Sequence, residues 1–265
     1  MILSIPSKRK HPMPRLLTSR LIFLSFCLLA ALAILPSRPA AAAEFTPDQR
    51  KEIEGIIKDF LANHPDLLMQ AIQDADDKLK ADAKNKVVKA LADHRQQVFD
   101  DPQSPTAGNP KGDVTLVEFF DYRCPYCKQV EAPLEKLLQD DKQLRFVYKE
   151  FPVLGPDSEL AAHVALAAKM QGKYDAFHRA LMATPGHPDE AAIYKVAASV
   201  GLDIDRLKQD AKSPDIEKQL KANLQLGQAL DIDGTPAFIV GTTIVPGAIS
   251  LEELKQLIAN TRAKG

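Results

Sequence analysis

Two neighbouring segments decide the fold: Asp113-Val-Thr-Leu-Val-Glu-Phe-Phe-Asp121 and, shortly after it, Cys124-Pro-Tyr-Cys127. The first is apolar and rich in β-branched and aromatic residues, which predicts a buried strand. Apolar residues then recur at helical spacing, so we expect a helix that begins at the cysteines. Its stripe consists of Val130, Leu134, Leu137 and Leu138, and Pro133 is expected to bend it. Residues 144–149 predict a second strand, and this order implies a right-handed parallel crossover.

The chain beyond this crossover adds helices and a hairpin. Residues 157–230 form a long helical stretch that Thr184-Pro-Gly186 and Ser213-Pro214 interrupt. Residues 236–245 predict a hairpin, and residues 251–261 predict a closing amphipathic helix. The fold class is therefore α/β.

The N-terminal residues 1–43 differ in composition from the rest of the chain. They hold six basic and no acidic side chains, an apolar run over residues 21–35, and the small-residue segment Ala40–Ala43. This order predicts a secretory signal peptide that is cleaved before Glu44, and hence a periplasmic protein. The alternatives are a retained membrane anchor, for which the run is short, and lipidation at Cys27. The acidic remainder of the chain argues against a nucleic-acid partner.

Residues 44–101 predict a helical arm, and residues 102–112 predict a linker rich in proline and glycine. Helical stripes occupy residues 53–61 and 68–91, with a break at Asn63-His64-Pro65 between them. Such helices bury too little apolar surface to be stable alone. We expect the arm to self-associate; the alternative is that it folds back on the C-terminal domain.

Cys124 and Cys127 are the cysteines left after cleavage, and a bridge between them closes almost no loop. Its expected use is therefore chemical rather than structural. A cysteine at the start of a helix lies among unpaired N–H groups, which lowers its pKa. Cys124 is thus the predicted nucleophile and Cys127 the resolving thiol. An inert bridge and half of a zinc site are the alternatives, but no second cysteine pair exists and the histidines are scattered, each expected at the surface or in a cap. We expect no metal and no organic cofactor.

Residues 113–265 resemble a thioredoxin-fold protein of the DsbA family, with a helical domain inserted at about residues 157–230. The resemblance implies that Glu118 is a buried acid that relays the proton of Cys127. We expect Lys149, on the neighbouring strand, to pair with Glu118; an outward-facing surface pair is the alternative. Thr235-Pro236 resembles the family's cis-proline loop, which implies that it orients an extended substrate chain.

Apolar surface near the dithiol is expected from Tyr126, Phe119 and Phe120, although either phenylalanine could instead belong to the core. The helical arm together with Cys-Pro-Tyr-Cys resembles the suppressor-of-copper-sensitivity C proteins, which implies trimerisation through residues 44–100 and disulfide isomerase activity. Thr235 before the proline resembles isomerases of the DsbC type. The Pro-Tyr dipeptide departs from the Pro-His of the typical oxidase, so the strength of oxidation stays open.

The sequence therefore predicts an exported thiol:disulfide oxidoreductase, an oxidase or isomerase. Its expected partners are unfolded or wrongly bridged exported proteins and a membrane protein that oxidises or reduces the dithiol. Two other functions stay open: a chaperone-like scaffold, and a copper-binding protein that uses the two thiolates.

Overall fold

The computed structural model describes residues 44–264, so the expected signal peptide and Cys27 lie outside the described residues. Contacts divide the chain into two compact units, with the division between Gln70 and Ala71 inside one long helix. Within the described residues, no helix combines the length and the apolar character needed to cross a membrane.

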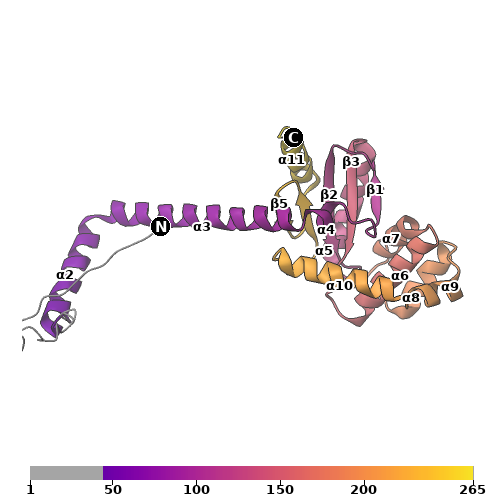
Figure 1. The fold of residues 1–265 in the computed structure, drawn as a ribbon, viewed down its shortest axis with the longest axis horizontal. Coiled ribbons are helices and arrows are strands. Elements are labelled where there is room, and N and C mark those ends of the chain that lie inside the picture. The colour runs from indigo at the N-terminus through magenta and orange to yellow at the C-terminus, as the bar shows by residue number, and fades with distance from the viewer. Residues whose placement is uncertain (1–43, 265) are drawn as a thin grey trace, which may run out of the picture. The chain divides into compact units, whose positions relative to one another are not determined.

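A five-stranded mixed sheet forms the centre of the second unit (Figure 1). Its strand order is β1-β3-β2-β4-β5. The central strands β2 and β3 run parallel, and every other pair is antiparallel. The strands are β1 (Thr106–Gly108), β2 (Val114–Phe120), β3 (Leu144–Glu150), β4 (Ala237–Val240) and β5 (Thr243–Pro246). The predicted crossover and hairpin are confirmed.

Helices cover the sheet and fill the predicted insertion between β3 and β4. α5 (Pro125–Asp140) makes the crossover from β2 to β3 and runs through Pro133. The insertion consists of α6 (Pro156–Met170), α7 (Tyr174–Met182), α8 (Glu190–Ser199), α9 (Ile204–Asp210) and α10 (Pro214–Ala229). α11 (Leu251–Arg262) closes the fold and begins with a capping box of Ser250 and Glu253. This is a thioredoxin-like fold with an inserted helical domain, as the sequence predicts.

The two faces of the sheet bury two separate clusters of apolar side chains. On β2, Leu116 and Phe120 face the cluster that contains α5, α6 and α7. Val117 and Phe119 face the other cluster, to which α10 contributes Leu226. Because successive strand residues point to opposite faces, Glu118 lies on the α5 side of the sheet.

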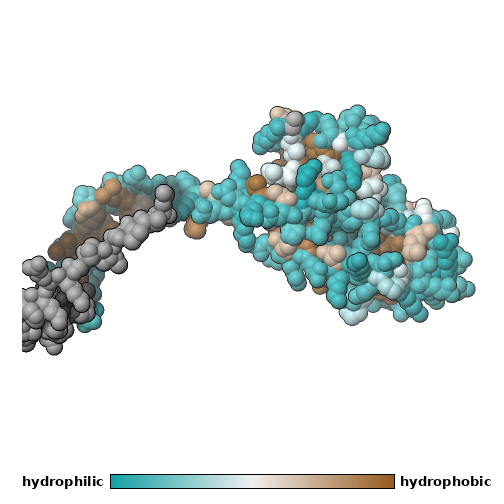
Figure 2. Space-filling model, viewed as in Figure 1, coloured by the Kyte–Doolittle hydropathy of each residue, from teal (hydrophilic) through white to brown (hydrophobic). Residues whose placement is uncertain are grey.

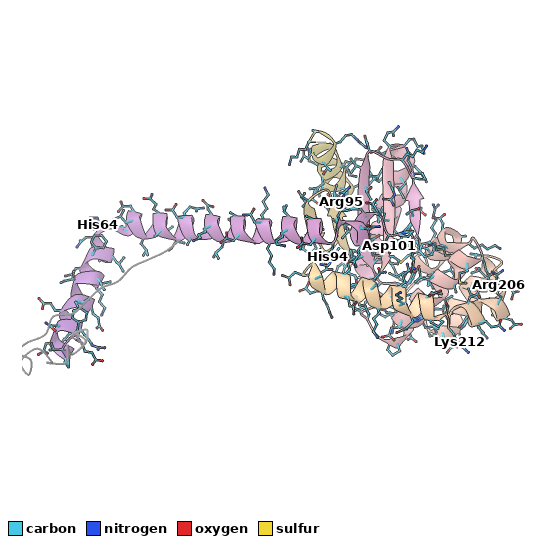
Figure 3. The ribbon with its side chains drawn as sticks, viewed as in Figure 1. His64, His94, Arg95, Asp101, Arg206 and Lys212 are labelled. Carbon is cyan, nitrogen blue, oxygen red and sulfur yellow. The ribbon has the colours of Figure 1, made fainter. Side chains whose placement is uncertain are left out.

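The end of the predicted arm belongs to the body of the second unit. The arm consists of α2 (Pro47–Asn63), α3 (Pro65–Asp93) and α4 (Arg95–Phe99). Leu91 at the end of α3, together with Val98 and Phe99 of α4, is buried in the second cluster. Figure 3 marks this region with His94, Arg95 and Asp101.

The predicted linker 102–112 contains strand β1, which the sequence analysis did not anticipate. β1 pairs with β3 in antiparallel register, Thr106 opposite Val147. Proline and glycine suggested an irregular segment, but the free edge of β3 offers hydrogen-bond partners that a local sequence pattern does not reveal. Gly108 ends the strand at a positive φ of 71°, where a side chain would meet the backbone of Leu144.

The arm helices α2 and α3 expose their apolar stripes. α2 buries no residue, and α3 buries only Leu91. The break between them falls at His64, as predicted, because Pro65 cannot continue the preceding helix. Figure 2 shows apolar residues among the hydrophilic ones on these helices. The large exposed apolar side chains here are Ile53, Ile56, Ile57, Phe60, Leu61, Leu67, Leu68, Met69, Ile72 and Leu79.

Candidate active site

Cys124 occupies the N-cap of α5, and Pro125 follows at the first helical position. Proline has no N–H to lose there, so the sequence itself starts the helix at the cysteine. A hydrogen bond from the Cys127 thiol lowers the pKa of Cys124 most, and the Thr235 side chain and the amides of Cys127 and Tyr126 lower it further. Burial acts in the opposite direction, and the resulting pKa is about 5, against 9.0 for an ordinary cysteine. Cys124 is therefore a thiolate at neutral pH.

Cys127 lies one turn further into α5 and is fully buried. Burial raises its pKa most, followed by the hydrogen bond to Cys124 and the negative charge of Glu118. Both cysteines are free thiols in this structure. The pair thus combines an ionised outer sulfur with a protonated inner one, which is the asymmetry that nucleophilic attack followed by internal resolution requires.

The Thr235–Pro236 loop lies against the dithiol, and its peptide bond is cis. Cys124 Sγ lies 3.2 Å from the carbonyl oxygen of Thr235, to which the thiol donates a hydrogen bond when it is protonated. The contact joins residues 111 positions apart in the chain. A chain linked to Cys124 through a disulfide therefore emerges beside the Thr235 backbone.

Tyr126 is 60% exposed and lies beside this loop. Tyr126, Thr235 and Ile244 line one cavity of about 510 Å³, to which Val87 of α3 also contributes. Phe119 and Phe120 are both fully buried and belong to the core rather than to this cavity. Of the three expected aromatic contacts, Tyr126 alone lies at the surface beside the dithiol.

Glu118 is completely buried, which excludes the alternative of a surface pair. Neither of its carboxylate oxygens has a hydrogen-bond partner. Burial raises the pKa of Glu118 well above its usual value, and the negative charges of Glu131, Cys124 and Glu150 raise it further. Because its charge in turn raises the pKa of Cys127, the two groups are electrostatically coupled.

The expected partnership of Glu118 with Lys149 is wrong. In the parallel register Lys149 lies opposite Phe119, while Glu118 lies opposite Tyr148, so the two side chains occupy opposite faces of the sheet. Lys149 is buried and donates to Gln97 O at 2.5 Å, Ser104 Oγ at 2.7 Å and Asp101 Oδ2 at 3.2 Å. It therefore fastens the segment between α4 and β1 to β3 and does not take part in the dithiol site.

Asp121 holds the turn that leads into the dithiol. Its buried carboxylate accepts hydrogen bonds from the backbone N–H groups of Arg123, Val153 and Leu154 at 2.7, 2.9 and 3.0 Å. It also accepts one from Ser158 Oγ of α6 at 2.8 Å. The insertion and the active-site turn are thus joined through one carboxylate.

Sequence reasoning missed a second layer of polar groups behind the dithiol. Glu150 is buried and accepts hydrogen bonds from the hydroxyls of Tyr174 at 2.7 Å and Tyr122 at 3.1 Å. Burial raises the pKa of Glu150 to about 8, although both tyrosines counteract this. Glu131 follows Cys127 by four residues in α5, so its place on the Cys127 face could have been inferred from helical spacing.

The expectation that every histidine lies at the surface or in a cap is wrong for His178. This side chain is completely buried and stacks on Tyr174, with ring centroids 5.7 Å apart. It lies one helical turn after Tyr174 on the apolar face of α7, next to Phe177 and Leu181. That stripe was the available signal, and it outweighs the general preference of histidine for partial exposure.

Within residues 44–264, no three His, Cys, Asp or Glu side chains gather in a metal-binding arrangement. The arrangement suits the exchange of thiols and disulfides. Cys124 can attack or be attacked at sulfur, and Cys127 is close enough to share a hydrogen bond with it. The carboxyl group of Glu118 lies near enough for its charge to raise the pKa of Cys127.

A family model of the DSBA-like thioredoxin domain matches residues 115–259. Among solved structures, a thioredoxin-like oxidoreductase from Silicibacter pomeroyi is 43% identical with a TM-score of 0.63, and the match covers 64% of this chain and 98% of that one. ScsC from Proteus mirabilis in a transitional conformation is 30% identical with a TM-score of 0.62. That match covers 83% of this chain and 98% of ScsC, so it extends into the N-terminal helical arm.

The curated relatives are longer proteins. Na(+)/H(+) antiporter NhaA 1 from Salinispora arenicola is 28% identical over 166 residues, which cover 62% of this chain and 26% of the antiporter. The chain thus spans about a quarter of the length of the curated relatives that it matches. The family model spans more than half of the chain and includes the dithiol, so the chain belongs to the DSBA-like thioredoxin domain family.

Proposed function

We propose that the protein is an exported thiol:disulfide oxidoreductase that reshuffles disulfide bonds in other proteins. The observation that carries this proposal is the asymmetry of the dithiol, in which the pKa of Cys124 falls to about 5 while that of buried Cys127 rises. A low-pKa outer thiol favours the reduced dithiol. The isomerase preference is supported by Thr235 before the proline and by the likeness to ScsC over the arm.

The exchange proceeds in two balanced steps. The Cys124 thiolate attacks a substrate disulfide, a mixed disulfide forms, and the other substrate sulfur leaves as a thiolate. In isomerisation, a different thiolate of the substrate attacks the substrate sulfur that is joined to Cys124; a new substrate disulfide forms and Cys124 leaves as a thiolate. In the second route, Cys127 attacks Cys124 Sγ; the Cys124–Cys127 disulfide forms, the substrate sulfur leaves as a thiolate, and the dithiol is thereby oxidised. In the second route Glu118 takes the proton of Cys127.

Glu118 is best suited to this task once the mixed disulfide exists. The charge of the free Cys124 thiolate is one of the causes that raise the pKa of Glu118. Formation of the mixed disulfide removes that charge, because the sulfur becomes neutral. The pKa of Glu118 then falls, and a larger fraction of the carboxylate is free to accept a proton. Proton transfer from Cys127 to Glu118 is therefore favoured only while the mixed disulfide is present.

The proposal includes an exported protein with residues 1–43 removed, so that the chain begins at Glu44. It also includes two kinds of partner: wrongly bridged exported proteins, and a membrane protein that keeps the dithiol reduced. A homo-oligomer formed through residues 44–100, of which a trimer is favoured, would place several dithiols around one substrate. The exposed apolar residues of α2 and α3 support the oligomer.

The test is the recovery of activity from an enzyme whose several disulfides have been scrambled. The mature chain in a glutathione buffer should accelerate recovery well above the buffer alone, because Cys124 opens wrong bridges. Cys124→Ala should reduce the acceleration to the buffer level, whereas Cys127→Ala, which keeps the nucleophile, should retain part of it. N-terminal sequencing of the exported protein should give Glu44 as the first residue.

Two results would redirect the proposal. If the chain oxidises a reduced substrate quickly and does not reactivate the scrambled one, it is an oxidase. If Cys124→Ala still protects unfolded chains from aggregation and restores as much activity as the original chain, the scaffold function replaces disulfide exchange.

A further inference from the structure

A cavity of about 510 Å³ opens beside the dithiol, and one of its walls comes from the N-terminal arm. Val87 of α3 lines this cavity, together with Ile244 of β5 and the loop 230–234 that precedes the cis-proline. Its volume lies within the roughly 300–1,000 Å³ of cavities that hold ligands in proteins. The exchange of sulfurs at Cys124 does not itself need such a cavity, so the cavity is available to recognise the substrate chain.

The cavity begins at the reacting sulfur. Cys124 Sγ lies 3.2 Å from the carbonyl oxygen of Thr235, and Thr235 lines the cavity. Tyr126 lies between the two cysteines in the sequence, is 60% exposed, and lines the cavity as well. A polypeptide joined to Cys124 through a disulfide therefore has the cavity within reach of the side chains that neighbour its own cysteine.

The wall that lies away from the cysteines is apolar. Leu230, Ile232 and Ala237 are buried in the second apolar cluster and line the cavity. Val87 and Ile244 pack against the same cluster but stay partly exposed. Partly exposed apolar side chains gain free energy when another apolar group covers them. This wall therefore favours a large apolar side chain.

Two carboxylates lie at the rim of the cavity. Asp231 and Asp233 both line it, and both are exposed. Lys86 of α3 pairs with Asp231 at 2.9 Å, whereas Asp233 has no ion-pair partner among the residues that the structure describes. One negative charge therefore remains at the rim, and a basic residue of the substrate can pair with it.

The end of α3 is held in place by contacts on both sides of Val87. Leu91, one turn further along, is buried in the second apolar cluster, and Lys86 pairs with Asp231. The ion pair is well exposed, with side chains 72% and 79% accessible, so it contributes little stability and the burial of Leu91 contributes more. Val87 is thus held by the body of the second unit and lines the cavity in a single chain.

We propose that this cavity binds a large apolar side chain of the substrate polypeptide, next to a basic residue that faces Asp233, and that Val87 makes the arm a specificity-determining part of the site. The proposal deepens the proposed function and rests on it, because the bound chain is the one whose disulfide Cys124 opens. The partner is an extended segment of an unfolded exported protein. Such a segment exposes the apolar side chains that a folded protein buries.

The test uses short peptides whose single cysteine is joined to nitrothiobenzoate through a disulfide. The Cys124 thiolate of the mature reduced chain attacks the peptide sulfur; a disulfide forms between Cys124 and the peptide, and nitrothiobenzoate leaves as a coloured thiolate. A host peptide of glycine and serine is compared with peptides that carry phenylalanine–lysine, phenylalanine–glutamate or alanine–lysine at different spacings from the cysteine. Stopped-flow absorbance at low peptide concentration gives the rate constants.

At the most favourable spacing, phenylalanine–lysine should react about tenfold faster than alanine–lysine, because the apolar wall covers the ring. Replacement of the lysine by glutamate should slow the reaction about threefold, since exposed charges interact weakly in water. Equal rate constants for all the peptides would overturn the proposal and leave disulfide exchange by Cys124 intact.

Val87→Phe fills the cavity from the side of the arm and should remove most of the tenfold preference for phenylalanine. Ala83→Phe, one turn earlier at an exposed position that does not line the cavity, is the matched control and should keep the preference. Asp233→Asn should abolish the threefold preference for lysine, whereas Asp205→Asn, at an exposed position of α9, should not. A Val87→Phe chain that keeps the full preference would overturn the role of the arm.

Cys124→Ala tests the proposed function separately, because this variant should release no nitrothiobenzoate from any peptide. Release that persists would overturn the exchange chemistry at Cys124, and this proposal with it. Light scattering tests whether a second copy of the chain fills the cavity. Val87→Phe should have the same molar mass as the unchanged chain, and a lower mass would assign the cavity to that copy and overturn the proposal.

A measurement on the unchanged protein does not depend on how a variant folds. The phenylalanine–lysine peptide, with serine in place of its cysteine, is added to the mature chain whose isoleucine methyl groups are labelled with ¹³C. The NMR signals of Ile232 and Ile244 at the cavity should shift, whereas the signal of Ile193, buried in α8, should not. Unchanged signals of Ile232 and Ile244 at millimolar peptide would overturn the proposal.

Discussion

At the scale of single residues, Cys124 and Lys149 show how position converts ordinary side chains into specialised ones. Cys124 gains its acidity from a helix that begins at its own position and from the thiol and amides that surround it. Lys149 loses contact with solvent but finds three acceptors. The first effect is chemical and the second is structural, and each leads to a separate prediction.

Reduced Cys124 should make folding stability depend on pH. Its pKa in the folded protein is about 5, below the 9.0 of an ordinary cysteine, so the folded state binds fewer protons than the unfolded state between these values. The stability of the reduced protein relative to Cys124→Ala should therefore be greatest above pH 9, decline as the pH falls, and vanish near pH 5. Urea unfolding of both proteins across this range measures it. A difference that stays constant with pH would contradict the low pKa.

Replacement of Lys149 by methionine should destabilise the protein by about 3 kcal/mol, because Asp101 loses its buried cation and Gln97 O loses a donor. The reactivity of Cys124 should not change, since Lys149 lies on the other face of the sheet. Urea unfolding measures the stability. The rate at which the Cys124 thiolate attacks dithiobisnitrobenzoate, followed through the absorbance of the released nitrothiobenzoate, measures the reactivity. Lys142→Met, at an exposed position, is the control. A large change in Cys124 reactivity would mean that the two faces are coupled.

At the scale of elements, the boundary between arm and body is the point that local patterns describe least well. α4 and β1 are short, and each is held by contacts with distant residues: α4 by the second apolar cluster and β1 by the edge of β3. A five-residue helix and a three-residue strand have no periodicity to detect.

Phe99→Ala in α4 should destabilise the protein by about 3 kcal/mol if α4 belongs to the body, as its burial indicates. Gln96→Ala, at an exposed position of the same helix, should change stability by less than about 0.5 kcal/mol. Urea unfolding at one fixed protein concentration compares them. Equal stability of the two variants would show that α4 contributes nothing to the stability of the body. Removal of the residues up to 100 would then leave that stability unchanged.

At the scale of the whole molecule, the apolar residues of α2 and α3 stand out, because a single chain does not bury them. Large exposed apolar patches usually mark surfaces that bind another protein or another copy of the chain. The residues repeat along α3 at Leu68, Ile72 and Leu79, which is the spacing of a helix that packs along a partner helix.

Ile72→Asp should therefore convert an oligomer into a monomer, because a buried charge in the helix–helix contact costs more than the contact supplies. Gln73→Asp adds the same charge away from the apolar stripe and should leave the assembly intact. Light scattering at micromolar concentration gives the mass of each. A monomeric mass for the unchanged chain would contradict self-association, and an oligomeric mass for Ile72→Asp would place the contact elsewhere.

The sequence by itself determined the class of fold and indicated the candidate reacting groups, because these depend on local features. A buried strand, a helix that starts with Cys-Pro, and a proline before an apolar run are each encoded within a few neighbouring residues. It also determined that Glu118 needs a buried partner or a special role, since a charge in an apolar strand is costly.

Only the tertiary structure decided which groups meet. Whether Glu118 faces Lys149 depends on the register and on the face of each strand, and a shift of one residue reverses the answer. The apolar stripe of α7 carries His178 into the core, where α5 supplies Glu131 and the turn after β2 supplies Tyr122. These contacts join segments about 50 residues apart, and no local pattern specifies them because their energy comes from packing among distant elements.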